Sequence, residues 1–432
     1  MSTPLTTRIA EEYAGAARAL PSSGAAAARR RAALTALTAT GLPTSRDENW
    51  KYASLRALER LRFAPATAVQ PAPAPAALPA VLADYPRYVF VDGVFAPAAS
   101  AALGVTRARL AVGTDAPEAE QEPNATPAGD ERFALLNAAF ATGAAAIHVP
   151  AGGAKPACLE LLFVASAASE AGASYPRLEV RLDPGARLIL IERHVSAAAA
   201  ASFVTSAVTV GLAAHARLEH YRLQDLNARC LLFDTLSATL AHDAVYQLHG
   251  ISTGAQAARS TLRVRLGGER AQLALAVAAL GDRQQVQDCF ALVEHAAPRG
   301  RTLQTFRGIS AGRARVAFNG KIVVERSAPG TDSQQSLRGL LAGAEAEIDV
   351  RPQLEIYSDE VRCSHGATAG KLDENMLFYL LSRGLSPDAA QRLLKWAFLE
   401  DVIAQISVPQ LRRQIEAHLA GQLRDEALRE LL

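Results

Sequence analysis

Cys363 and His365 are the two residues of this sequence whose types and spacing are best suited to chemistry. They lie in the segment VRCSHGATAGK, where a single serine separates the thiol from the imidazole. If this segment is a β-strand, residues two apart share one face, so both side chains point the same way. Zinc and iron accept thiolate and imidazole ligands, but two ligands do not complete a tetrahedral site. The pair therefore predicts a site completed by another chain, a transient metal site, or an ordinary packed strand end.

Two further motifs resemble nucleotide-binding or catalytic signatures, and neither has the surroundings that its chemistry needs. Residues 366–371 read GATAGK, with three residues between the first glycine and the Gly-Lys pair, and Leu372 follows. A phosphate-binding loop needs four residues there and a Ser or Thr after the lysine. Residues 308–312 read GISAG, but a strand-like segment follows Ser310 where a nucleophile elbow needs a helix. We expect neither nucleotide binding nor a serine nucleophile.

The other histidines and the cysteines show no familiar metal-ligand spacing. No HExxH motif occurs, His215 and His220 are five residues apart, and His242 and His249 are seven apart. We expect most histidines to be ordinary surface or hydrogen-bonded residues. The four cysteines are far apart and form no CxxC motif, which indicates reduced thiols rather than a disulfide framework or a zinc ribbon.

The strand that would carry Cys363 and His365 belongs to a weak internal repeat. From about residue 88 to 365 the apolar residues recur with a period of two, in β-branched runs separated by turn residues. Six such strands align at steps of 30, 27, 28, 43 and 32 residues. The aligned positions are Leu188, Leu218, Val245, Leu273, Val316 and Ile348. Repeats of this length predict a β-solenoid whose stacked coils bury one apolar column, with a β-sandwich as the alternative.

The chain divides into three regions. Residues 1–85 are expected to be helical and end in a Pro/Ala-rich spacer, residues 86–366 form the β-solenoid core, and residues 367–432 form a C-terminal helical domain. In the last region Asp373 is expected to cap one helix, and Ser386 with Pro387 to begin the next. The predicted fold class is thus mainly β, with a β-solenoid core flanked by N-terminal and C-terminal helical domains.

The overall composition excludes several classes of partner. The 45 basic and 43 acidic residues give a net charge of +2, so there is no electrostatic reason to expect a nucleic acid or an anionic membrane as the partner. The longest uncharged run contains Ser and Thr within β-branched, alternating sequence, which favours strands over a membrane span. The N-terminus lacks the layout of a secretion signal, and we expect a cytoplasmic protein.

Long segments near both ends of the chain resemble the SufB/SufD family of iron–sulfur cluster assembly proteins. These segments are PTSRDENWKYASLRAL and VRCSHGATAGKLDENMLFYLLSRGL. Two segments between them, FALLNAAFATGAAAIHVPAG and the sequence from FNGKIVVE to IYSDEV, are also similar, so the resemblance covers nearly the whole chain. The CSHGA sequence favours the SufD branch, because the SufB branch has an acidic residue in an E-H-E-A context at this point.

The resemblance implies a right-handed parallel β-helix and a place in a three-component complex. The chain would pair with SufB through the β-helix, and its C-terminal helices would bind the ATPase SufC. Cys363 and His365 would then act in cluster assembly at the SufB interface, as metal ligands shared with that chain. The expected SufC-binding residues are Leu377, Phe378, Tyr379, Arg383, Leu393, Leu394 and Phe398.

The predicted function is therefore a non-catalytic scaffold subunit that assembles nascent iron–sulfur clusters and transfers them to apo-proteins. We expect no tightly bound cofactor of the chain's own, but a transient cluster shared with SufB. The resemblance leaves open a flavin in the complex and a homodimer of the isolated chain. The alternatives are a SufB-like homodimeric scaffold, a stand-alone zinc protein using Cys363 and His365, and a β-helix polysaccharide-active enzyme. The low aromatic content, 6%, disfavours the enzyme.

Overall fold

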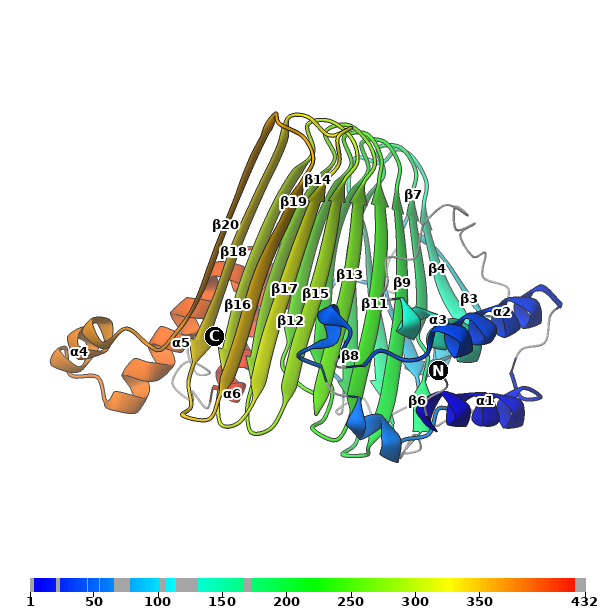
Figure 1. The fold of residues 1–432 in the computed structure, drawn as a ribbon, viewed down its shortest axis with the longest axis horizontal. Helices are drawn as coiled ribbons and strands as arrows, with labels where there is room; N and C mark the ends of the chain where they lie inside the picture. The colour runs from blue at the N-terminus through cyan, green and yellow to red at the C-terminus, as the bar shows by residue number, and fades with distance from the viewer. Residues whose placement is uncertain are drawn as a thin grey trace.

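The structure is a computed structural model that describes residues 4–20, 24–44, 46–53, 55–65, 78–101, 106–113, 131–166 and 172–423. These residues form a mainly β protein, a parallel solenoid of about seven turns with helices at both ends (Figure 1). The predicted fold class is confirmed, and the β-sandwich alternative is wrong because successive coils pair in parallel. No helix within the described residues is both long and apolar enough to span a membrane.

Two long sheets form the walls of the solenoid, and each coil contributes one strand to each sheet. The strands of the first sheet, in spatial order, are β2 (Val94–Phe95), β1 (Arg87–Val91), β5 (Ala157–Ala165), β8 (Arg187–Ser196), β10 (Arg217–Asp225), β12 (Val245–Ser252), β14 (Gln272–Gly281), β16 (Arg301–Ser310), β18 (Thr331–Leu341) and β20 (Val361–Gly370). All neighbours in this sheet are parallel except β1 and β2, which are antiparallel.

The second sheet faces the first across the interior. Its strands, in spatial order, are β19 (Glu347–Ile356), β17 (Arg315–Val324), β15 (Val286–His295), β13 (Ala257–Leu266), β11 (Leu231–Leu240), β9 (Ser202–Leu212), β7 (Arg177–Leu182), β4 (Ala144–Val149) and β3 (Arg109–Gly113). A short strand, β6 (Gly172–Ser174), also pairs with β9, and β3 runs antiparallel to β4. The two sheets end together at β19 and β20.

The register of the coils corrects the repeat alignment in two places. Leu188, Leu218, Tyr246 and Leu273 pair in succession across the first sheet, so Tyr246 takes the place that the alignment assigned to its neighbour Val245. The step of 43 residues was a misassignment, because it joins Leu273 of the first sheet to Val316 of β17 in the second sheet. The alignment did not detect the change of sheet, since β17 and β19 have the same apolar alternation as the strands of the first sheet. Within the first sheet the next partner of Leu273 is Thr302.

Alternation along each strand fills the solenoid with apolar side chains. Residues two apart point to the same side of a strand, and the inward set forms one continuous core that runs through the coils. One inward row of the first sheet consists of Leu190, His220, Leu248, Leu275, Gln304, Gln335 and His365. The row is apolar in the middle coils and becomes polar toward the last coil.

The N-terminal helices pack on the outside of the second sheet. They are α1 (Pro4–Ala16), α2 (Gly24–Thr40) and the 3-10 helices η1 (Glu48–Trp50) and η2 (Arg56–Arg60), joined by α3 (Arg132–Phe140) from the segment assigned to the core. A further 3-10 helix, η4 (Pro97–Ala99), follows β2. Trp50 is buried against the stacked pair Phe133 and Phe233, with ring centroids 5.3 and 6.0 Å away, so the tryptophan of the WKY segment attaches this region to the sheet.

The C-terminal helices are α4 (Glu374–Ser382), α5 (Pro387–Ile403) and α6 (Pro409–Gln422). Asp373 accepts hydrogen bonds from two backbone N–H groups of α4, and Ser386 caps α5 ahead of Pro387, so both predicted helix starts are confirmed. α5 and α6 pack on the outside of the first sheet, where Arg307 of β16 forms a 2.8 Å ion pair with Asp401. α4 extends away from the solenoid beyond β20 (Figure 1).

Candidate functional site

Cys363 and His365 lie on the last strand of the solenoid and face its interior. Cys363 pairs in register with Ser333 of β18, and His365 pairs with Gln335. The Cys363 side chain is half-buried against the apolar core, while His365 is exposed at the open end of the coil stack. The strand and the shared face predicted for this pair are confirmed, although β20 continues to Gly370, beyond the domain boundary placed at residue 366.

The neighbouring strand β18 places two polar side chains, Ser333 and Gln335, next to this pair. Gln335 is buried and donates hydrogen bonds from Nε2 to Gln304 Oε1 at 2.9 Å and to the Gly320 carbonyl at 3.0 Å. Its Oε1, and the Oγ of fully buried Ser333, have no hydrogen-bond partner in the structure. Buried polar atoms are normally satisfied, so two open acceptors directly inside Cys363 and His365 favour a polar occupant here.

The environment of Cys363 keeps its thiol protonated. Burial raises the pKa of this thiol above its ordinary value, the nearby Asp332 carboxylate raises it further, and a hydrogen bond from the Ser333 backbone acts in the opposite direction. At neutral pH the isolated chain therefore presents a thiol rather than a thiolate. A metal ion or a cation brought by another chain would be needed to generate the ligating form.

Cys363 and His365 do not form a complete ligand set within this chain. Among the described residues, only His215, His242 and Asp243 form a group of three potential ligands close enough to share one metal ion. That group lies at the turns preceding β10 and β12, far along the coil stack from β20. Within the described part of the chain Cys363 and His365 thus supply at most two ligands, and completion of the site by another chain stays a prediction.

Most of the large exposed apolar residues at this end of the molecule lie on the C-terminal helices, and Ile356 and Tyr357 lie at the end of β19. The side chains of Met376, Phe378, Tyr379, Leu381 and Leu393 are exposed, with Phe378 at 73%. Of the residues predicted to bind an ATPase partner, Phe378, Tyr379, Arg383 and Leu393 are exposed, and Leu377, Leu394 and Phe398 are partly covered. In contrast, α5 buries Leu399, Val402 and Ile403 against the solenoid. An exposed apolar helix face of this kind is typical of a protein-binding surface.

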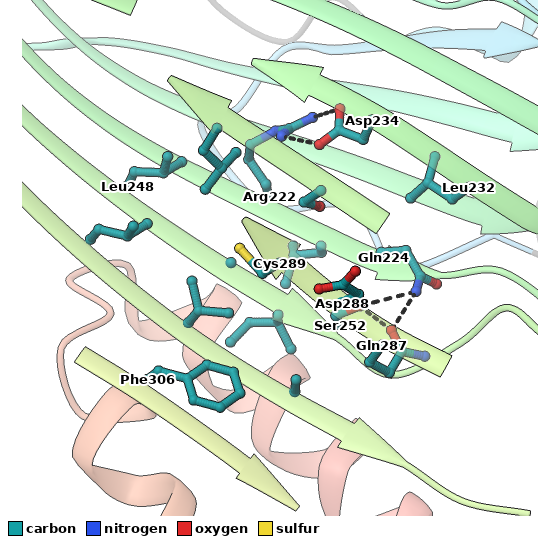
Figure 2. A pocket seen from close by; sticks show the side chains of 18 of the residues that line it. Arg222, Gln224, Leu232, Asp234, Leu248, Ser252, Gln287, Asp288, Cys289 and Phe306 are labelled. Atoms are coloured by element: carbon teal, nitrogen blue, oxygen red, sulfur yellow. Dashed lines mark hydrogen bonds and ion pairs between the residues drawn. The ribbon is translucent and has the colours of Figure 1, made fainter. Parts of the chain in front are cut away.

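A second group of functional side chains lies inside the solenoid, and the sequence analysis did not anticipate it (Figure 2). Arg222 donates two hydrogen bonds to Asp234, at 2.6 and 2.8 Å, and two to Glu192, at 2.8 and 2.9 Å. Glu192 is fully buried and also contacts His194 and His220. Burial alone would raise the pKa of Glu192, but the charge of Arg222 and these hydrogen bonds hold it well below its ordinary value.

This charged group borders an internal cavity of about 70 Å³. On its polar side Gln287 accepts a hydrogen bond of 2.5 Å from Ser252 and one of 3.5 Å from Gln224, as Figure 2 shows. The remaining wall includes apolar residues such as Leu248 and Phe306. The charges are paired, so we assign the cluster a structural role in holding neighbouring coils in register. The signal available in the sequence was a charged residue at an inward position of an otherwise apolar alternation.

The GISAG and GATAGK segments, which the sequence analysis rejected as a nucleophile elbow and a phosphate-binding loop, both lie in or at the end of β-strands. Ser310 is fully buried in β16, and its hydroxyl donates a hydrogen bond of 2.7 Å to the Ala314 carbonyl, so it is no exposed nucleophile. Residues 366–370 belong to β20, and no helix begins directly after Lys371 as a phosphate-binding loop requires.

Comparison with known proteins identifies the family. The family model described as "SUF system FeS cluster assembly, SufBD core domain" matches residues 163–398, more than half of the chain. The chain belongs to the SufBD family. This SufBD protein is an iron–sulfur cluster assembly protein, and the matched region runs from β5 through the core and most of α5.

Relatives of the SufBD protein match it over almost its whole length. It is 33% identical over 392 residues to the iron-sulfur cluster assembly protein SufD of Escherichia coli, covering 90% of this chain and 91% of the relative. It is 28% identical over 404 residues to the SufBD family protein slr0076 of Synechocystis, covering 90% of this chain and 89% of the relative. The family resemblance predicted from the end segments is thus confirmed.

Proposed function

We propose that this SufBD protein is a SufD-type, non-catalytic scaffold subunit that assembles iron–sulfur clusters together with a SufB-type chain and a SufC-type ATPase. The observation that carries this proposal is the position of Cys363 and His365. A thiol and an imidazole face the interior of the outermost coil, above two buried acceptors without partners. A site of this kind needs a second chain to complete it.

The open end of the solenoid is the surface that we propose for the SufB-type chain. β19 and β20 are ten residues long each, and within the described residues no strand pairs with their outer edges. The unpaired N–H and C=O groups along such an edge can form hydrogen bonds with a strand of another chain, which then extends the sheet. Pairing here would cover the exposed side chains of Ile356 and His365 and place ligands of the partner next to Cys363.

The exposed face of α4 and the start of α5 is the surface that we propose for the ATPase. Phe378 and Tyr379 are large aromatic residues of the type that dominates the binding free energy of protein interfaces. Because α5 also packs on β14 and β16, a movement of the ATPase would be transmitted to the first sheet through Arg307 and Asp401. The mechanical coupling therefore reaches the sheet that ends in β20.

The chemistry proposed for Cys363 is exchange of its proton for an iron ion. Iron is the part of the cargo that the site binds directly, and a thiolate is the form that ligates it. The thiol proton leaves when the metal binds, and His365 supplies an imidazole nitrogen from the same face. The flanking Ser333 hydroxyl and Gln335 carbonyl oxygen can then accept hydrogen bonds from water or sulfur-bound protons.

Co-expression with SufB-type and SufC-type proteins tests the subunit assignment. We expect the three chains to co-purify, and Cys363→Ser and His365→Ala to leave assembly intact while lowering the yield of reconstituted cluster at least several-fold. His148, a partly exposed histidine on the other sheet, provides the matched control, and His148→Ala should behave as wild type. Failure to co-purify would contradict the subunit role; normal cluster yield in both site variants would contradict the site alone.

The same experiment separates the remaining alternatives. A homodimer that binds clusters without a SufB-type chain would replace our proposal by a homodimeric scaffold. A monomer that holds one zinc ion through Cys363 and His365 would instead support a stand-alone zinc protein. Membership in the SufBD family argues against a polysaccharide-active enzyme.

A further inference from the structure

A stack of left-handed turns runs along the solenoid where the second sheet leads into the first. Gly185, His215, Asp243, Arg270 and Arg299 occupy equivalent positions, with φ between 53° and 70°. Each donates its backbone N–H to a carbonyl of the next coil, at 2.8–3.0 Å. The turns lie at the upper edge of the solenoid in Figure 1. Side chains 28 residues apart in the sequence, such as His215 and Asp243, are therefore stacked directly on one another.

Two histidines and an aspartate meet on this stack. Asp243 Oδ2 lies 3.0 Å from His242 Nε2 and 3.6 Å from His215 Nδ1, and the three ligand atoms are all within 4.8 Å of one another. Ligands at about 2.1 Å from one ion are separated by roughly 3.0–3.4 Å. The three atoms need only small rotamer adjustments to reach that geometry, and all three side chains are accessible from solvent.

A cationic side chain already contacts the two adjacent ligands of this group. The Arg270 guanidinium lies 2.9 Å from His242 Nε2 and donates hydrogen bonds of 2.8 and 2.7 Å to the two Asp243 carboxylate oxygens. The cluster is thus arranged so that one positive charge contacts an imidazole nitrogen and a carboxylate together.

We propose that His215, His242 and Asp243 bind one divalent first-row transition-metal ion, with Arg270 occupying the same position when the ion is absent. Two imidazoles and one carboxylate form a ligand set suited to Zn²⁺, Co²⁺ or Fe²⁺, and water completes the coordination. Arg270 has an alternative partner in Glu269, which it already contacts at 3.1 Å. Its displacement therefore leaves no unpaired charge.

The bound ion would link two neighbouring coils, because His215 precedes β10 whereas His242 and Asp243 precede β12. Metal binding to the folded state alone stabilises a protein in proportion to the logarithm of ligand concentration over Kd. The proposal does not depend on Cys363 or His365. Its tests therefore use a Cys363→Ser/His365→Ala background, so that the open end of the solenoid contributes no ligands.

Titration of the full chain with Co²⁺, followed by its visible d–d absorption, tests this site. We expect one ion per chain, at least ten-fold weaker binding in His215→Ala and in His242→Ala, and binding tightened about three-fold or more in Arg270→Ala. His148→Ala is the matched control, because His148 faces Asp183 at 3.0 Å without a second histidine in its cluster. Its affinity should equal that of the background protein.

A thermal melt with and without Zn²⁺ provides the second measurement. The melting temperature of the background protein should rise with Zn²⁺, and the rise should vanish in His242→Ala. No Co²⁺ binding up to about 1 mM, or equal affinities in the background, His215→Ala and His242→Ala proteins, would overturn the proposed site. Unchanged or weaker binding in Arg270→Ala would overturn the competition with Arg270.

Discussion

The two ends of the solenoid are built differently. At the N-terminal end both sheets finish in short antiparallel strands, β2 and β3, of two and five residues. At the C-terminal end both sheets finish in ten-residue parallel strands with free edges within the described part of the chain. Short antiparallel strands limit the edge that another chain can pair with, whereas long parallel edges offer a template for it. This difference supports the open end, rather than the closed end, as the surface that we propose for the SufB-type chain.

The N-terminal and C-terminal regions of the chain also differ in how far their aromatic side chains are covered. In the N-terminal region Trp50 is only 2% exposed and lies against Phe133, Phe233 and the guanidinium of Arg259. In the C-terminal region Phe378 is 73% exposed. One aromatic residue therefore stabilises the fold, and the other is available to a partner. Substitutions at the two ends should separate stability from binding.

The largest effect on stability is expected for Trp50→Ala in the N-terminal region. Removal of a buried aromatic side chain leaves a cavity and should lower the free energy of unfolding by about 3–5 kcal/mol. Urea denaturation followed by circular dichroism measures this change. Phe378→Ala is the comparison and should change stability by less than about 0.5 kcal/mol, because the ring is exposed. Similar losses in both variants would contradict the distinction between a buried anchor in the N-terminal region and an exposed aromatic residue in the C-terminal region.

The next largest effect is expected for the affinity of the SufC-type ATPase. Phe378→Ala should weaken binding by at least about 2 kcal/mol, or roughly 30-fold, because buried aromatic residues dominate interface energies. Surface plasmon resonance with the purified ATPase measures it. Leu303→Ala removes an equally apolar exposed side chain, 45% exposed on β16, and should leave the affinity unchanged. Equal losses in the two variants would indicate a general apolar effect.

A smaller effect is expected from a charge at the open end. Ile356→Asp places a carboxylate where β19 would meet a SufB-type chain, and burying that charge should weaken pairing about ten-fold. Ala111→Asp puts the same charge at an exposed position of β3 at the closed end. Its binding should equal wild type in a pull-down titration. If Ala111→Asp were the more damaging variant, the partner would bind the N-terminal end.

The smallest effect concerns the reactivity of Cys363. Because burial and Asp332 raise the thiol pKa above its ordinary value, alkylation by iodoacetamide should be slower at pH 7.5 than that of an unburied thiol, and its rate should still be rising with pH where that of an unburied thiol has levelled off. Asp332→Asn removes a negative charge, lowers the pKa and should speed alkylation a few-fold, as measured by mass spectrometry.

Cys158 is the control for this measurement, since burial raises its pKa as well and Asp332 is not among the groups that act on it. Its alkylation rate should be the same in both proteins. A Cys363 rate profile with its midpoint near neutral pH would show that the open end already supplies a cation to the thiol.

The prediction from sequence was most accurate where local alternation decides the result. A period of two is sufficient to place Cys363 and His365 on one face of a strand, and cap residues are sufficient to start α4 and α5. The prediction was inaccurate where register matters. Val245 was aligned at the place that its neighbour Tyr246 takes, because the steps between paired strands vary with the lengths of the turns. The alternation alone does not reveal to which sheet a strand belongs.

The sites that combine different coils were beyond the sequence analysis. The histidines were judged by their spacing within one strand, so the pairing of His215 with His242, one coil away, was missed. The Arg222 cluster was missed for the same reason, because its partners Glu192 and Asp234 lie on two other strands. Ser333 and Gln335 lie in a segment that resembles the family, but the sequence did not show that they are next to Cys363 and His365. Only the pairing of β18 with β20 shows this.

By itself the sequence determined the family, the solenoid class and the incomplete character of the Cys363–His365 pair, because these depend on motifs and on a two-residue period. Only the tertiary structure decided that the pair faces inward at an open end, that Trp50 is a buried anchor while Phe378 is exposed, and that His215, His242 and Asp243 converge. The physical reason is that stacking brings together residues about one coil apart, and the length of each coil depends on its turns.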